Sequence, residues 1–241
     1  MKNILEILKE QKNIGLKGNL YHATQINFAY NTNHIEGSTL TEEQTRYIYE
    51  TNTLLVDSSN QAVKVDDIIE MTNHFKLVDY MLDHAEEELT QNMIKEFHKI
   101  LKTGTSDEKK SWFKVGEYKE LKNEVGGMQT AKPEEVAQEM EKLLKWYNSL
   151  EEVTFNDIVK FHAIFEKIHP FQDGNGRVGR MIIFKEALKN NIMPFIILDK
   201  DKLYYYRGLK EYQSGGEKGY LVDTCLNAQD QYEVLVRNLI D

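Results

Sequence analysis

The chain has 241 residues, of which 41% are hydrophobic, and its formal net charge is −9. This length and hydrophobic content suffice for one large buried core, and the acidic balance argues against a general nucleic-acid-binding protein, which needs clustered lysine and arginine. No apolar run approaches the length of a membrane span.

The first segment, MKNILEILKEQK, is amphipathic and charged, and it lacks the apolar core and the cleavage site of a secretory signal. The single cysteine, Cys225, cannot form an internal disulfide, which fits a reducing compartment. No stretch rich in glycine, serine and proline marks a linker. We therefore expect a compact cytoplasmic protein with N-terminal helices and with neither a nucleic-acid nor a membrane partner.

Most of the chain has the apolar periodicity of amphipathic helices, with hydrophobic residues three or four positions apart. The segments that share it are residues 65–82, 93–101, 136–147, 158–168 and 221–239. Helix-start signals precede three of them: Thr90 is a suitable N-cap, Pro133 fits a first turn, and Thr154 with Asp157 resembles a capping box. The pattern predicts an all-α fold, a helical bundle.

One segment departs from the helical pattern. Residues 115–130, VGEYKELKNEVGGMQT, alternate in character and contain paired glycines and a polar turn at Lys122 and Asn123. We expect a short β-hairpin here, called the flap below, in an otherwise helical protein.

Two histidines fall on apolar helix faces. Neither His98 nor His162 has a cysteine, aspartate or glutamate partner at metal-ligand spacing. We expect both to be core histidines with hydrogen-bond partners.

The most informative segment is residues 169–180, HPFQDGNGRVGR, called the signature loop below. It joins the helix at residues 158–168 to an apolar helical stretch at residues 181–188. Pro170 prevents simple continuation of the first helix, and Phe171 can anchor the loop in the core. The loop is therefore expected to be held at both ends.

The composition of the signature loop suits a phosphate site. Gly174 and Gly176 allow successive backbone N–H groups to point into one concavity, and the following helix adds its positive N-terminal end. Arg177 and Arg180 share a helix face, and each can donate two hydrogen bonds to a phosphate. Asp173 offers an oxygen ligand, and Mg²⁺ needs only one or two protein carboxylates when phosphates and water complete its shell. A Gly-rich turn with only a structural role would not explain why a carboxylate and two arginines converge on the same backbone donors.

The loop resembles the signature of the Fic family, HPFx(D/E)GNGRxxR, at every specified position, with looser likenesses in IEGSTLT, FHKIL, VGEYK and YYRGL. The resemblance implies a Fic fold with N-terminal helices over residues 1–60, a Fic core over 61–215 and a C-terminal helix packed on it over 216–241. It also implies an enzyme, a protein adenylyltransferase, which transfers AMP from ATP to a Ser, Thr or Tyr hydroxyl of a target protein and releases pyrophosphate.

The family roles, carried onto the matching positions, agree with the chemistry of the residues. His169 would be the general base, for which an imidazole with an unperturbed pKa of about 6.5 is suited. Asp173 would hold Mg²⁺ between the α and β phosphates. The nucleotide ligands would be Asn175 with the amides of Gly174 and Gly176 for the α and β phosphates, Arg177 for the β phosphate, Arg180 for the γ phosphate, and Tyr205 or Tyr204 for the adenine.

The flap would align an extended segment of the target protein by strand addition, with Met128 nearest its far strand, and bring the hydroxyl to His169. The sequence leaves open whether the protein modifies itself and whether it forms a homo-oligomer.

Residues 32–37, TNHIEG, match the family's inhibitory pattern (S/T)xxxE(G/N), at a location that resembles the subclass whose inhibitory helix precedes the Fic core. Thr32 and Glu36 lie one turn apart on one helix face, and Gly37 is a suitable helix stop. A negative charge at a helix C-terminus is disfavoured by up to about 1 kcal/mol, which a nearby cation would offset. A pair between Glu36 and Arg180 would occupy the γ-phosphate ligand and inhibit transfer.

Three alternatives stay open. Some Fic relatives use another nucleotide or a phosphocholine donor, and one branch acts as a kinase, although that branch departs from the GNGR pattern. Removal of AMP, with Glu36 positioning a water, would make the enzyme bifunctional. A nucleotide-sensing module would bind ATP without turnover.

Overall fold

The computed structural model describes residues 3–55 and 62–240 and is mostly helical, with one small antiparallel sheet. In chain order the elements are α1 (Ile4–Ile14), α2 (Leu20–Ile35), α3 (Glu42–Thr51), α4 (Val65–Asp83), α5 (Gln91–Lys102), η1 (Ser106–Lys109), β1 (Glu124–Val125), β2 (Met128–Gln129), α6 (Pro133–Asn148), α7 (Phe155–Ile168), α8 (Asn175–Lys189), η2 (Asp199–Asp201), α9 (Lys202–Gln213) and α10 (Gly219–Ile240). The predicted all-α fold with a short hairpin is confirmed. The division into three parts stays a prediction, because its first boundary, at residue 60, lies outside the described residues.

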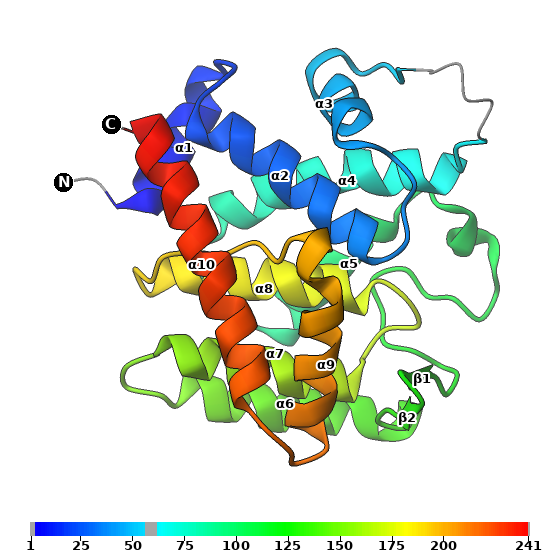
Figure 1. Ribbon diagram of the computed structural model, residues 1–241. Coiled ribbons are helices and arrows are strands. Elements are labelled where there is room, and N and C mark those ends of the chain that lie inside the picture. The colour runs from blue at the N-terminus through cyan, green and yellow to red at the C-terminus, as the bar shows by residue number, and fades with distance from the viewer. Residues whose placement is uncertain (1–2, 56–61, 241) are drawn as a thin grey trace.

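Two helices, α2 and α8, lie inside the bundle. Helix α8 packs on α7, α5 and α4, and α2 contacts α1, α4, α8 and α10, while α9 and α10 run side by side over α7 (Figure 1). Most residues of α2 and α8 are buried, whichever way they point. A helix buried on all sides belongs to the core. The two arginines of the signature loop, which lie on α8, are therefore held inside the protein.

The core consists of aromatic and aliphatic side chains from most helices. In its main part Phe28 of α2 and Phe184 of α8 pack with ring centroids 5.1 Å apart. A second part lies under α9 and α10, where Cys225 is buried and free. Among the described residues, no helix is both long and apolar enough to cross a membrane.

The predicted helix starts are confirmed. Thr90 caps α5 by accepting a hydrogen bond from the Met93 N–H, and Thr154 and Asp157 form a capping box at the start of α7. Each such cap satisfies backbone donors that have no partner within the helix.

Removal of the cap of α7 should have a measurable cost. Thr154→Ala is expected to lower the free energy of unfolding by about 1 kcal/mol, because the Asp157 N–H loses its side-chain acceptor and keeps only the Thr154 carbonyl. Urea denaturation measures the change. Thr224→Ala is the control, since this hydroxyl only bonds back to the Tyr220 carbonyl within α10. Equal changes in the two variants would contradict the capping role.

The hairpin is shorter than the segment from which it was predicted, and its turn lies elsewhere. Val125 pairs with Met128 across a two-residue turn at Gly126 and Gly127, whose φ angles are 58° and 78°. Such a turn needs two left-handed residues, which glycine supplies. The prediction of a turn at Lys122 and Asn123 is wrong, because Asn123 instead donates a hydrogen bond from Nδ2 to the Phe171 carbonyl.

Candidate active site

The signature loop is fixed between two helix ends. His169 is the C-cap of α7 in a left-handed conformation, with φ 52° and ψ 63°, and its N–H donates to the Phe165 carbonyl at 2.9 Å. Gly174, with φ 80°, precedes α8. The first N–H groups of α8, from Asn175 to Arg177, have no carbonyl within their own helix to bond. They form the positive helix end that the sequence predicts for the phosphate site.

The side chain of Asn175 braces this loop from inside. It is 1% exposed, and its Oδ1 accepts from the Phe171 N–H while its Nδ2 donates to the Phe171 carbonyl, both at 2.8 Å. Because the side chain bonds within the loop, we assign the predicted phosphate contact of Asn175 to its backbone N–H, and that contact stays a prediction.

His98 holds the same loop from α5. Its ring stacks on Phe171 with centroids 4.1 Å apart, Nδ1 accepts from the Gly116 N–H at 2.9 Å, and Nε2 contacts the Asp173 carbonyl at 3.2 Å. Because Nδ1 accepts, Nε2 carries the proton that it donates to Asp173. Burial lowers the pKa of His98 to about 3, so the ring is neutral. The expected core histidine is confirmed, but its bracing of the loop was not foreseen.

His169 is held as a neutral imidazole. Burial, with the nearby Lys119 ammonium, lowers the pKa of His169 to about 4. The Glu166 carboxyl lies 3.7 Å from Nδ1 and is itself buried, which raises the pKa of Glu166 to about 8 and keeps it protonated at neutral pH. An uncharged imidazole at pH 7 is able to accept a proton.

The flap is fastened to this histidine end of the loop by Lys119. Its N–H donates to the Pro170 carbonyl at 2.9 Å, and its ammonium, 4% exposed as a residue, donates to Asn123 and Thr130 at 2.7 Å each. Burial lowers the pKa of Lys119 to about 8. No motif marks Lys119 in the sequence beyond its place in VGEYK.

Asp173 and Arg177 lie in a network of charges. Asp173 Oδ2 is 2.7 Å from the Lys102 ammonium and 3.2 Å from Arg177 Nη2, and Arg177 also pairs with Glu70 of α4. Burial would raise the pKa of Asp173, but Arg177 and Lys102 hold it well below its ordinary value. Asp173 is therefore a carboxylate, and half of its side chain stays exposed. Its oxygens fit Mg²⁺, which prefers hard oxygen ligands.

Arg180 is bound by the end of α2. Its Nε donates to Thr32 Oγ1 at 2.7 Å, and its Nη2 donates to the Thr32 carbonyl at 3.1 Å and to Glu36 Oε1 at 2.6 Å. Glu36 is the C-cap of α2, and Gly37 follows with φ 95°. The pair between Glu36 and Arg180 that the sequence predicts is thus present in the structure.

The Glu36 carboxylate also lies against the start of α8. A β-carbon at Gly176 would collide with Glu36 Oε1 and lie 2.9 Å from Arg180 Nη1. The carboxylate therefore lies where the phosphate site was predicted, between the helix end and the arginine. Burial alone would lower the pKa of Arg180, but Glu36 raises it, so the guanidinium is firmly charged.

Tyr205 is buried beside Arg180, with 1% exposure, and its hydroxyl bonds to His162 Nε2 at 2.6 Å. His162 is therefore a core histidine with a partner, as expected. Tyr204 is 66% exposed. In this conformation Tyr205 presents no open ring face, and its adenine contact stays a prediction.

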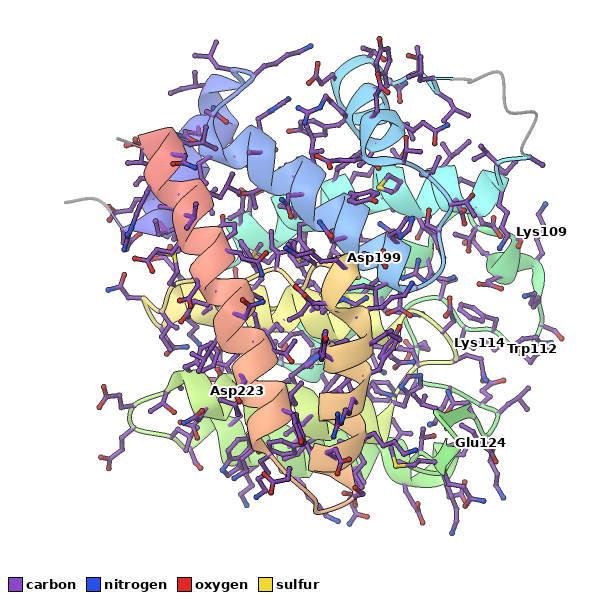
Figure 2. All side chains as sticks on the ribbon, in the orientation of Figure 1. Lys109, Trp112, Lys114, Glu124, Asp199 and Asp223 are labelled. Atoms are coloured by element: carbon purple, nitrogen blue, oxygen red, sulfur yellow. The ribbon has the colours of Figure 1, made fainter. Side chains whose placement is uncertain are left out.

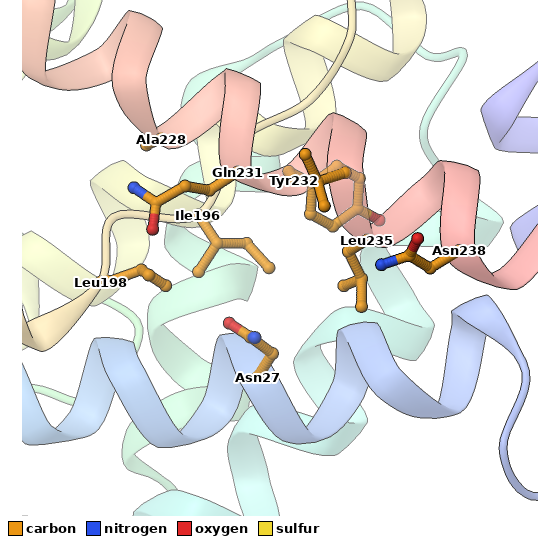
Figure 3. Close-up of a pocket in the computed structure, with 9 residues that line it drawn as sticks. Asn27, Ile196, Leu198, Ala228, Gln231, Tyr232, Leu235 and Asn238 are labelled. Atoms are coloured by element: carbon orange, nitrogen blue, oxygen red, sulfur yellow. The ribbon is translucent and has the colours of Figure 1, made fainter.

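An apolar cavity of about 350 Å³ lies between α2 and α10, with Asn27, Ile196 and Tyr232 in its wall (Figure 3). None of the predicted site residues lines it. The candidate site therefore rests on the signature loop and its charged partners.

Comparison with known proteins points to one family. Residues 88–186 match the Fic/DOC family. The chain is 30% identical over 188 residues to protein adenylyltransferase Fic of Drosophila ananassae, a match that covers 75% of this chain and 35% of that protein. It is 25% identical over 189 residues to protein adenylyltransferase fic-1 of Caenorhabditis elegans, covering 76% of this chain and 35% of that protein. The chain thus spans about a third of the length of these relatives.

Among solved structures, a Fic domain containing signaling protein from Bacteroides thetaiotaomicron has a similar fold, with a TM-score of 0.72 and 25% identity. The match covers 97% of this chain and 94% of that one. The similarity therefore extends over the helices on both sides of the signature loop.

Proposed function

Because the chain belongs to the Fic/DOC family, we propose that it is a protein adenylyltransferase, which transfers AMP from ATP to a Ser, Thr or Tyr hydroxyl of a target protein. One observation carries the proposal. A neutral His169, the first N–H groups of α8 and two buried arginines, Arg177 and Arg180, meet around one loop. The names of the relatives support the same reaction.

In the proposed reaction His169 takes the proton from the target hydroxyl as its oxygen bonds to the α phosphorus. The bond from that phosphorus to the oxygen bridging to the β phosphate breaks, and pyrophosphate leaves with the electron pair. The N–H groups of Gly174, Asn175 and Gly176 would stabilise the charge that develops on the α and β phosphates. Arg177 would bind the β phosphate and Arg180 the γ phosphate.

Asp173 would hold Mg²⁺ through the exposed part of its carboxylate. When bound, this ion supplies positive charge against the phosphates. The resting protein would be autoinhibited, because the Glu36 carboxylate pairs with Arg180 and lies against Gly176. The γ phosphate would need the Arg180 guanidinium and the space beside Gly176.

The target protein would dock at the flap, which lies on an outer edge of the molecule. Glu124 of β1 extends from that edge, and Lys114 and Trp112 extend on the same side (Figure 2). The hydrogen bonds of Lys119 and Asn123 to the signature loop would fix the distance from a docked segment to His169.

Labelled ATP tests the reaction. The assay uses the Glu36→Gly variant and a cell lysate as the source of target proteins. We expect label from the α phosphate to enter protein and label from the γ phosphate to leave as pyrophosphate. Protein labelled from the γ position would indicate a kinase instead. Bound but untransferred ATP would indicate a nucleotide sensor. Wild-type protein that strips label from modified targets would indicate the bifunctional enzyme, since Glu36 lies in the site.

A further inference from the structure

A buried lysine, Lys102, is at the centre of three carboxylates beside the signature loop. Its ammonium lies 2.5 Å from Glu70 Oε1, 2.6 Å from Asp107 Oδ2 and 2.7 Å from Asp173 Oδ2. The side chain is 2% exposed and comes from the last residue of α5, while the carboxylates come from α4, η1 and the loop. An ammonium has three N–H donors, so its hydrogen-bonding capacity is filled by these three acceptors.

Without Lys102 this cluster would have the composition of a divalent cation site. One oxygen from each of Glu70, Asp107 and Asp173 lies within 4.8 Å of the others. Several carboxylate oxygens around one point are what Mg²⁺, Mn²⁺ and Ca²⁺ bind, and without a cation their negative charges repel one another. The charge of Lys102 is well fixed: burial would lower its pKa, but Asp173 and Glu70 raise it above the ordinary value.

Arg177 closes the cluster on the side of the helix. It contacts Glu70 and Asp173, so three carboxylates face two cations. The side chains of Glu70 and Asp107 are 13% and 17% exposed, whereas that of Asp173 is 51% exposed. Asp173 alone therefore offers an accessible carboxylate edge to an ion from solvent.

We propose that Lys102 is the resident cation of this cluster, a positioning residue that replaces a divalent ion and orients Asp173. The nucleotide-free protein then binds a divalent ion only weakly, and the ion that Asp173 holds arrives together with the phosphates that complete its shell. This proposal rests on the proposed function in one respect only, the assignment of Asp173 as the ligand of the ion.

Mn²⁺ titration of the nucleotide-free protein, followed by electron paramagnetic resonance of the free ion, tests this proposal. Lys102→Met removes the charge and keeps a similar chain length. We expect this variant to bind Mn²⁺ about tenfold or more tightly than wild type, because three carboxylates lose their internal cation. Without metal, the melting temperature of the variant should be below that of wild type. Addition of Mn²⁺ should raise the melting temperature of the variant.

The matched control is Lys99→Met, which removes an exposed lysine one turn earlier on α5 whose ion-pair partner is Glu96, at 3.4 Å. It should behave as wild type. A folded Lys102→Met protein without a gain in Mn²⁺ affinity would overturn the proposal, as would wild-type protein that binds Mn²⁺ equally well. If the variant folds only with Mn²⁺ present, the proposal is supported; if Mn²⁺ does not restore folding, it is wrong. No ATP is used, so failure here is separate from failure of the transferase assignment.

Discussion

Glu36→Gly should raise AMP transfer by about 5- to 150-fold, the range of a coupling free energy of about 1–3 kcal/mol. The reason is competition for one guanidinium. The Glu36 carboxylate pairs with Arg180 at 2.6 Å and lies against Gly176, so it must leave before a γ phosphate can bind there. Transfer of α-labelled AMP to protein measures the effect.

The same variant should also change the melting temperature, and the change should depend on whether ATP and Mg²⁺ are present. A nonspecific destabilisation would lower the melting temperature under both conditions. Arg180 is 2% exposed and would lose its carboxylate partner while keeping its hydrogen bonds to Thr32. We therefore expect a lower melting temperature without ATP and a larger rise with ATP and Mg²⁺. Glu42→Gly is the control, since Glu42 is exposed and lies 3.8 Å from Arg46, its ion-pair partner. If transfer by the Glu36 variant is no faster than by wild type, the autoinhibition proposal fails.

His169→Ala should reduce AMP transfer by about 10²- to 10⁴-fold, the contribution of a positioned general base. ATP binding with Mg²⁺ should persist, because the proposed phosphate ligands lie on α8 and the loop that leads into it. Single-turnover transfer and ATP affinity, measured on the same preparation, separate the two effects. His84→Ala, which removes a surface histidine paired with Glu87, should leave both unchanged.

The pH dependence offers a second measurement of this role. The pKa of His169 is lowered to about 4, so the imidazole remains a competent base from neutral pH down to roughly pH 5. Protonation of His169 should therefore cause no loss of kcat/KM between pH 7 and pH 5. A loss of base function centred near pH 6.5, or normal transfer by the alanine variant, would contradict the assignment.

Local sequence signals predicted the helices well, and the reason is physical. The stripe of apolar residues in α4 and the caps at Thr90 and Thr154 act within a few positions of the chain. The hairpin turn was misplaced because Lys122 and Asn123 resemble a polar turn, whereas Asn123 is used to bond the Phe171 carbonyl. That partner is distant in sequence and leaves no local trace.

The charged surroundings of the site could not be predicted for the same reason. Lys102 and Glu70 are polar residues of amphipathic helices, and such residues usually face solvent. Their contact joins positions 32 residues apart, and each becomes buried only when α4, α5 and the loop come together. The pair of Glu36 and Arg180 was predictable because both residues belong to patterns with a known spacing.

The burial of α2 limits how the proposed inhibition of Arg180 by Glu36 could be relieved. This helix is enclosed by α1, α4, α8 and α10, and Thr24 near its start bonds the Tyr232 hydroxyl inside the protein. An outward movement of the whole helix would expose the buried side chains of the core to solvent. In the proposed mechanism we therefore expect activation to be a small local event, either a rotation of the Glu36 carboxylate or an unwinding of the last turn before Gly37, driven by a competing anion.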